Sequence, residues 1–190
     1  MSNRIAYLTA AAFSALALTA TITAPVSAQE KTVMVGGAAM FPSKNIVQNA
    51  VNSKDHTTLV AAVKAAGLVE TLEGKGPFTV FAPTNAAFAA LPAGTVDNLL
   101  KPENKAALTK VLTYHVVSGK LETAALIKAV DAGGGKAMLT EVSGGMLTVT
   151  KSGTMIMLSD ESGGMAHVTI PDVVQSNGVI HVVDKVLLPK

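Results

Sequence analysis

The chain has 190 residues, a net charge of +2 at pH 7, 4% aromatic residues and no cysteine. The lack of cysteine excludes disulfides, thiolate catalysis and cysteine-based metal sites. Arg4 is the single arginine and tryptophan is absent, so the arginine contacts and stacking surfaces of nucleic-acid-binding proteins are missing, and we expect no nucleic-acid partner.

The N-terminus has the pattern of a secretory signal peptide. Arg4 precedes an apolar run over 5–20, and small residues occupy the cleavage positions before Gln29. The predicted organisation is a signal peptide at 1–28, an extended or loosely docked lead-in at 29–42 and a folded domain at 43–188. Cleavage would leave 162 of the 190 residues, enough for one hydrophobic core. The mature chain has no second long apolar run, so we expect no membrane span and a secreted or periplasmic location.

Helical spacing of apolar residues predominates in the first two thirds of the chain. It predicts a short helix after Ser43, which could cap it, and a longer helix over 55–74 that either continues or divides at Gly67. Further helices are predicted after Pro102 and over 122–130.

Short strands predominate after residue 135. They are predicted within 136–142, 146–151, 154–159, 165–174 and 179–188, separated by glycine-containing turns that include Asn177-Gly178. Because helices come first and strands last, the order indicates an α+β fold.

The segment GPFTVFAPTNAAFAALP, residues 76–92, changes from strand to helix without a loop. Apolar residues on both faces of the strand beginning at Phe78 predict burial on both sides. Pro83 ends the strand, Thr84 or Asn85 caps the following helix, and Phe88 anchors that helix on the core. We interpret this corner as structural rather than catalytic.

Three segments resemble the signature regions of the fasciclin domain, as found in single-domain secreted proteins of bacteria. They are FTVFAPTNAAF (78–88), LTYHVV (112–117) and NGVIHVVDKVLLP (177–189). The resemblance implies an α+β fold in which helices pack around a wedge-shaped β-sandwich. It also implies a non-enzymatic adhesion or interaction module without a cofactor, whose partners are proteins or polysaccharides of the cell surface or matrix. Asn85 and Ser118 depart from the aspartate and proline that are common at these positions.

The resemblance makes Tyr114 and His115 candidates for an adhesive surface. The alternative is that Tyr114 packs in the core while His115 bonds a backbone carbonyl or the Asn85 corner. In the last strand, His181 is expected to be structural, and Asp184 is expected to accept hydrogen bonds from backbone N–H groups.

No G-x-S-x-G segment accompanies the serines, histidines and acids of the chain, so we expect no hydrolase. A copper(I) site is a further hypothesis: Met155, Met157, Met165 and His167 would converge if 157 paired with 165 and 155 with 167. A slip of one residue would separate them, and methionines more often fill cores or cover surfaces.

The alternative to an interaction module is a binder of a small apolar ligand, such as a pigment or lipid. Such a protein should contain an apolar pocket of about 300 Å³ or more.

Overall fold

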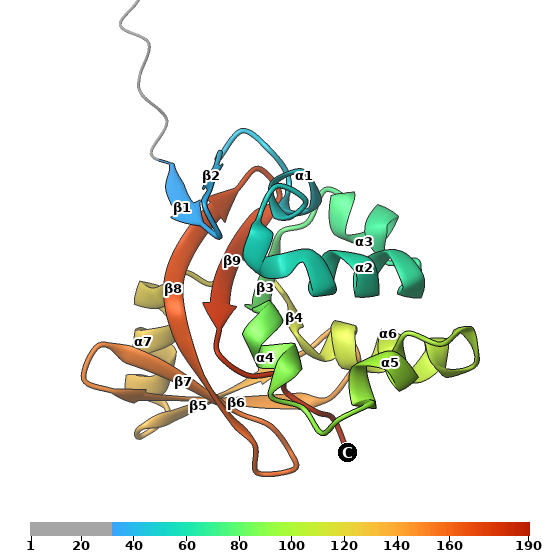
Figure 1. Ribbon diagram of the computed structural model, residues 1–190. Helices are drawn as coiled ribbons and strands as arrows, with labels where there is room; N and C mark the ends of the chain where they lie inside the picture. The colour runs from blue at the N-terminus through green and yellow to red at the C-terminus, as the bar shows by residue number, and fades with distance from the viewer. Residues whose placement is uncertain (1–31) are drawn as a thin grey trace, which may run out of the picture.

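The computed structural model describes residues 32–190, so the predicted signal peptide and the first residues of the lead-in lie outside the described part (Figure 1). Within 32–190, no helix is long and apolar enough to cross a membrane. The α+β prediction is confirmed, because helices surround one large curved sheet.

Helices form most of the first part of the described chain. They are α1 (Ile46–Ala50), α2 (Thr57–Ala66), α3 (Val69–Glu73), α4 (Asn85–Ala89), α5 (Thr95–Leu99), α6 (Lys105–Tyr114) and α7 (Thr123–Ala132), with 3-10 turns at Lys54–His56 and Pro102–Asn104. Gly67 divides α2 from α3 because it adopts a left-handed conformation with φ of 75°. Asn45, rather than Ser43, caps α1, and its side chain accepts a hydrogen bond from Gln48 N.

The strands form a small hairpin and a seven-stranded sheet. They are β1 (Val33–Val35), β2 (Ala38–Met40), β3 (Phe78–Pro83), β4 (Val116–Ser118), β5 (Lys136–Thr140), β6 (Met146–Ser152), β7 (Met155–Ser159), β8 (Met165–Gln175) and β9 (Gly178–Val183). The large sheet has the order β4-β3-β9-β8-β7-β6-β5, and β3–β9 is its parallel pair.

The seven-stranded sheet curls until its outer strands nearly meet. A bridge joins Val117 in β4 to Glu141 just after β5, and Val142 N donates to Val116 O at 2.9 Å. The long strand β8 takes part in both halves, pairing first with β7 and then with β9. Register shifts on either side of Ile170 bend it between them. The two facing halves enclose an interior, as expected of the predicted sandwich.

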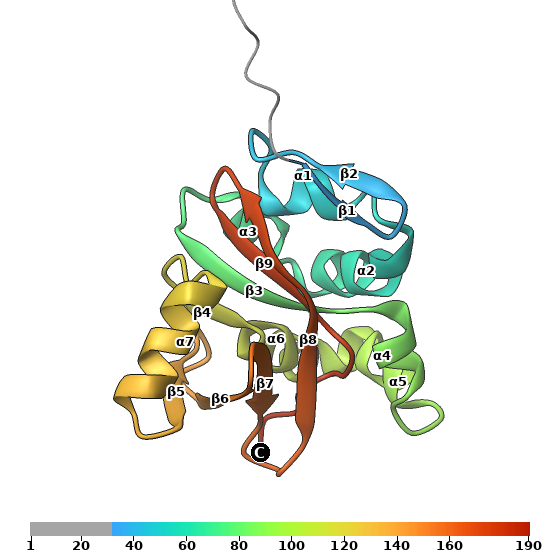
Figure 2. The ribbon, with the colours of Figure 1, turned by 90° about the vertical axis from the view of Figure 1, so that its left-hand side faces the viewer.

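Strand β3 is buried on both faces, as predicted. In Figure 2, α2 and α7 lie on different sides of β3. Val80 and Ala82 belong to the core between the sheet and helices α1, α2, α3, α4 and α6. Phe81 points to the opposite side, into the core enclosed by the curled sheet and α7. The corner after β3 therefore joins two apolar cores.

Two predictions need correction. The described part of the lead-in is extended, which was one of the two alternatives, but it is not loosely docked: β1 and β2 pair as a hairpin, and Val35 and Met40 are buried in the helix-side core. The last strand ends at Val183 rather than Leu188. Beyond Val183 the chain leaves the sheet, and Leu187 packs into the core inside the curled sheet.

The β8–β9 turn is tight, but its two loop residues are Ser176 and Asn177, since Gln175 pairs with Gly178. Gly178 is therefore not one of the turn residues. Glycine is required there because β3 passes too close to leave room for a side chain. A Cβ added there would lie 2.1 Å from Phe78 O.

Gly178→Ala is expected to push β9 away from β3 and to cost roughly 3 kcal/mol of stability, a typical value for overpacking. Urea unfolding measures it. Gly153→Asn is the matched control, because a side chain at Gly153 meets nothing within 4 Å and Asn tolerates its φ of 62°. Equal stability of the two variants would contradict this explanation of Gly178.

Candidate functional site

Tyr114 and His115 lie where α6 runs into β4, and both side chains are buried. Their exposed fractions are 0% and 2%. His115 Nδ1 donates to Val111 O at 2.7 Å, while Nε2 accepts from Leu187 N at 3.0 Å. These two contacts fix the tautomer of a neutral imidazole. Burial lowers the pKa of His115 to about 4, so the ring is neutral at pH 7.

The Tyr114 hydroxyl belongs to a polar cluster at one end of the curled sheet. It donates to Met146 O at 3.1 Å and accepts from Glu161 N at 3.2 Å. Burial is the main reason that the pKa of Tyr114 rises to about 12. Neither Tyr114 nor His115 reaches the surface. Their burial gives no support to an adhesive role, which stays a prediction.

Glu141, which the sequence did not single out, lies in the same polar cluster. It is 4% exposed. Its Oε2 accepts from Ser143 Oγ at 2.6 Å, whereas Oε1 has no hydrogen-bond partner within residues 32–190. Burial, assisted by the nearby Glu161 carboxylate, raises the pKa of Glu141 to about 7 against the opposing effect of the Ser143 hydrogen bond. A buried acid of this kind could be found only from the fold, because its burial depends on closure of the sheet.

The corner after β3 is held by two side chains with different partners. Thr84 Oγ1 accepts from Ala87 N at 3.2 Å and caps α4. Asn85 instead reaches the start of α2, accepting from Thr58 N at 3.0 Å and donating to Lys54 O at 2.8 Å. An ionised aspartate at position 85 could not donate a hydrogen bond to Lys54 O, whereas the asparagine amide does.

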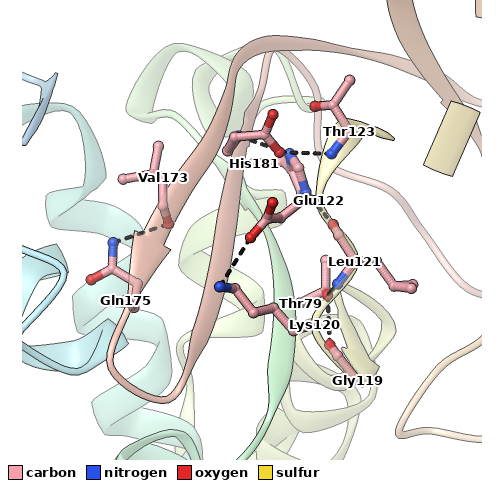
Figure 3. Close-up of polar contacts among 10 residues, drawn as sticks. Thr79, Gly119, Lys120, Leu121, Glu122, Thr123, Val173, Gln175 and His181 are labelled. Atoms are coloured by element: carbon pink, nitrogen blue, oxygen red, sulfur yellow. Dashed lines mark hydrogen bonds and ion pairs between the residues drawn. The ribbon is translucent and has the colours of Figure 1, made fainter. Parts of the chain in front are cut away.

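A buried network surrounds His181 on the parallel pair β3–β9 (Figure 3). His181 Nε2 donates to Leu121 O at 2.8 Å, and Nδ1 accepts from Asp172 N at 3.3 Å. Asp172 has a φ of 55°, and its carboxylate accepts from Thr123 N at 2.7 Å. The ring also stacks on Phe81. Burial lowers the pKa of His181, so the ring is neutral. Its hydrogen bonds connect β9 to β8 and to the segment before α7.

Asn177 and Asp184 also bond backbone groups. Asn177 Oδ1 accepts from Ile46 N at 3.1 Å, and its Nδ2 donates to Leu72 O at 2.7 Å, so one amide joins α1 and α3 to the β8–β9 turn. Asp184 accepts from His167 N at 2.7 Å, and its second oxygen lies 3.0 Å from His167 Nδ1. Both residues lie at the ends of the β9 segment and connect it to other elements.

The hairpin register that the copper(I) hypothesis assumed is not the one observed, which is shifted by two residues. Met157 faces His167, and Met165 faces Ser159. The difference comes from the loop, where Asp160 Oδ1 accepts from Ser162 N and tightens the turn. A shift of two preserves the face, so Met155, Met157, Met165 and His167 still lie on one side of the hairpin.

An apolar cavity of about 60 Å³ lies between α1–α3 and the sheet. Its lining is almost wholly apolar, and His56 and His115 contribute to its wall. His56 Nδ1 lies 2.9 Å from Ser53 Oγ, and burial lowers the pKa of the ring. Nothing in the local pattern of the sequence indicated this cavity, because residues from β1 to β9 form it.

Comparisons with known proteins agree with this fold. The family model described as the fasciclin domain matches residues 54–189. The chain is 47% identical over 188 residues to Protein sll1483 of Synechocystis sp., covering 98% of this chain and 96% of the relative. It is 33% identical to Immunogenic protein MPB70 of Mycobacterium bovis, covering 100% and 98% of the two chains.

Longer proteins also match over part of their length. Identity to the transforming growth factor-beta-induced protein ig-h3 of Sus scrofa is 37%, covering 69% of this chain and 17% of that protein. A solved FAS1 domain pair from the insect cell adhesion molecule fasciclin I superposes with a TM-score of 0.68 at 18% identity, covering 78% of this chain and 52% of that one. The predicted domain start at residue 43 precedes the start of the family match and stays a prediction. The chain belongs to the fasciclin domain family.

Proposed function

We propose that this protein is an exported, non-enzymatic interaction module that binds a protein on a cell surface or in the extracellular matrix. The observation that carries the proposal is how the polar residues of the three signature segments are used. His115, His181 and Asn177 are buried and bonded to backbone groups. In the part of the chain that the structure describes, no three histidine, cysteine or acidic side chains form a group that could hold a metal ion.

We therefore expect the protein to bind its partner through solvent-exposed side chains outside these segments. The outer side of the β5–β6 hairpin carries exposed apolar side chains: Met138 is 59% exposed, Val142 48% and Met146 36%. Met138 and Met146 stand on the same face, paired with Thr148 and Thr140. Methionine is common at adaptable binding surfaces, and clustered apolar exposure is typical of protein contacts. The likeness to a domain pair from a cell adhesion molecule supports the same function.

A deletion strain tests the proposal. Cells lacking the protein are expected to attach less well to their natural surface or to one another, and the wild-type gene should restore attachment. Protease treatment of the receiving surface should abolish the restored attachment, because the proposed partner is a protein. Attachment that survives protease but not glycosidase treatment would replace a protein partner with a polysaccharide, and unchanged attachment of the deletion strain would remove the adhesive role.

The alternative function, binding of a pigment or lipid, depends on the helix-side cavity. At about 60 Å³ this cavity is well below the roughly 150 Å³ of an apolar cavity that accepts benzene. A larger ligand would require α1–α3 to move away from the sheet. Organic extraction of protein purified from its native host, followed by mass spectrometry, distinguishes the two functions. A stoichiometric apolar molecule in the extract would favour the ligand-binding alternative.

A further inference from the structure

We propose that the outer face of the β7–β8 hairpin binds copper(I) through Met157, His167 and at least one of Met155 and Met165. This binding site is separate from the proposed adhesive function and does not depend on it. The proposal rests on the positions of the candidate ligands along the strands. Each strand has two of them, two residues apart: 155 and 157 in β7, and 165 and 167 in β8. Residues two apart in a strand point to the same face.

Burial shows which face that is. The intervening residues Ile156, Leu158 and Ala166 are buried in the core inside the curled sheet. The candidate ligands therefore point outward, where Met155 is 52% and Met165 46% exposed. A metal ion can reach them without disturbing the fold.

The register brings the central pair together. Met157 and His167 are directly opposite, which places their Cβ atoms about 5 Å apart. Met155 lies two residues before Met157, and Met165 two residues before His167, so both are neighbours of the central pair. β7 and β8 run side by side in Figure 2.

Asp184 orients the imidazole in the manner of metal-binding histidines. Its Oδ2 lies 3.0 Å from His167 Nδ1, and its Oδ1 accepts from His167 N at 2.7 Å. With the Nδ1 proton directed at the carboxylate, the lone pair of neutral His167 is on Nε2. A carboxylate behind a histidine ligand fixes the tautomer and strengthens the donor nitrogen.

The donor set selects the metal. Thioethers are soft ligands that favour copper(I), whereas calcium and magnesium require oxygen donors and structural zinc sites use thiolates or several histidines. Two thioethers and one imidazole suit a three-coordinate copper(I) ion. All three donors are neutral ligands.

Silver(I), which mimics copper(I) and does not change oxidation state under these conditions, gives the direct test. Protein labelled with ¹³C at the methionine methyl groups is titrated with silver(I) and followed by NMR. The first equivalent is expected to shift Met157 together with Met155 or Met165. Met34 and Met138, each 59% exposed, are internal references that should stay in place. Equal shifts of all exposed methionines, or none, would overturn the site.

Affinity measurements on variants complete the test. Competition with a chromogenic copper(I) chelator under anaerobic reducing conditions should show Met157→Leu and His167→Gln weakened by at least about tenfold, and Asp184→Asn by roughly tenfold. Met138→Leu is the matched control and should bind as the wild type does. Methionine-to-leucine changes nearly conserve volume, so the fold should persist, and thermal unfolding verifies it. Wild-type affinity in Met157→Leu or His167→Gln would contradict the assignment.

Discussion

Replacing His115 with alanine is expected to lower the free energy of unfolding by about 4 kcal/mol. The change leaves Val111 O and Leu187 N without their side-chain partners inside the protein, and each orphaned buried group costs about 1–3 kcal/mol. The space left by the ring adds a cavity cost. The melting temperature should fall by roughly 10 °C.

The pH dependence of stability gives an independent check on His115. Its folded pKa of about 4 is below the value of 6.5 expected of the unfolded chain, so between these values the unfolded state binds more protons. Wild-type stability should therefore fall as the pH drops from 6.5 to 4. The slope should be shallower in His115→Ala but not zero, because burial also lowers the pKa values of His56 and His181.

His167→Ala is the matched control, since this side chain is 39% exposed and the Asp184 side chain that it contacts is 38% exposed. It should cost about 1 kcal/mol or less. Urea unfolding at several pH values measures all three proteins. A His115→Ala protein as stable as the wild type, with an unchanged slope, would contradict the structural role of His115.

Glu141→Gln is expected to stabilise the protein above pH 7. The folded pKa of Glu141 is about 7 and its reference value is 4.5. Between these values the folded state holds a proton that the unfolded state has released, so the wild type loses stability as the pH rises through this window and stays penalised above it. Glutamine cannot ionise and keeps an oxygen for Ser143. The gain at pH 8 should approach about 3 kcal/mol.

Two features of the Glu141→Gln experiment make it decisive. The gain should shrink as the pH is lowered from 8 to 4.5, because the wild-type carboxyl becomes protonated in both states. Glu103→Gln is the control, since Glu103 forms an exposed ion pair with Lys101, and its removal should change stability by less than about 0.5 kcal/mol. A pH-independent effect of Glu141→Gln, or a loss of stability at pH 8, would show that folding does not raise the pKa of Glu141.

Local patterns in the sequence predicted most of the elements. The corner at 83–85 was recognisable because proline, a cap residue and an apolar anchor act over a few residues. The division at Gly67 and the turns at Gly144 and Gly163 follow equally from glycine in left-handed conformations. These features depend on backbone chemistry within one turn of chain.

Features that depend on distant residues could not be predicted. Asn85 bonds α2 and Asn177 bonds α1 and α3, contacts that no local pattern specifies. The final strand was predicted too long because the apolar run continues past Val183, where the chain turns inward to pack Leu187. The burial of Glu141 requires β4 and β5 to meet, which follows only from the curvature of the whole sheet.

A single comparison tests most directly the claim that the signature residues are structural and that binding uses the exterior. Attachment is measured for the deletion strain carrying either the double variant Met138→Lys, Met146→Lys or His115→Ala, at a temperature where both proteins are folded. The double variant should keep the wild-type melting temperature and lose attachment, whereas His115→Ala should melt lower and still attach. Attachment lost in folded His115→Ala but retained in the double variant would contradict the claim.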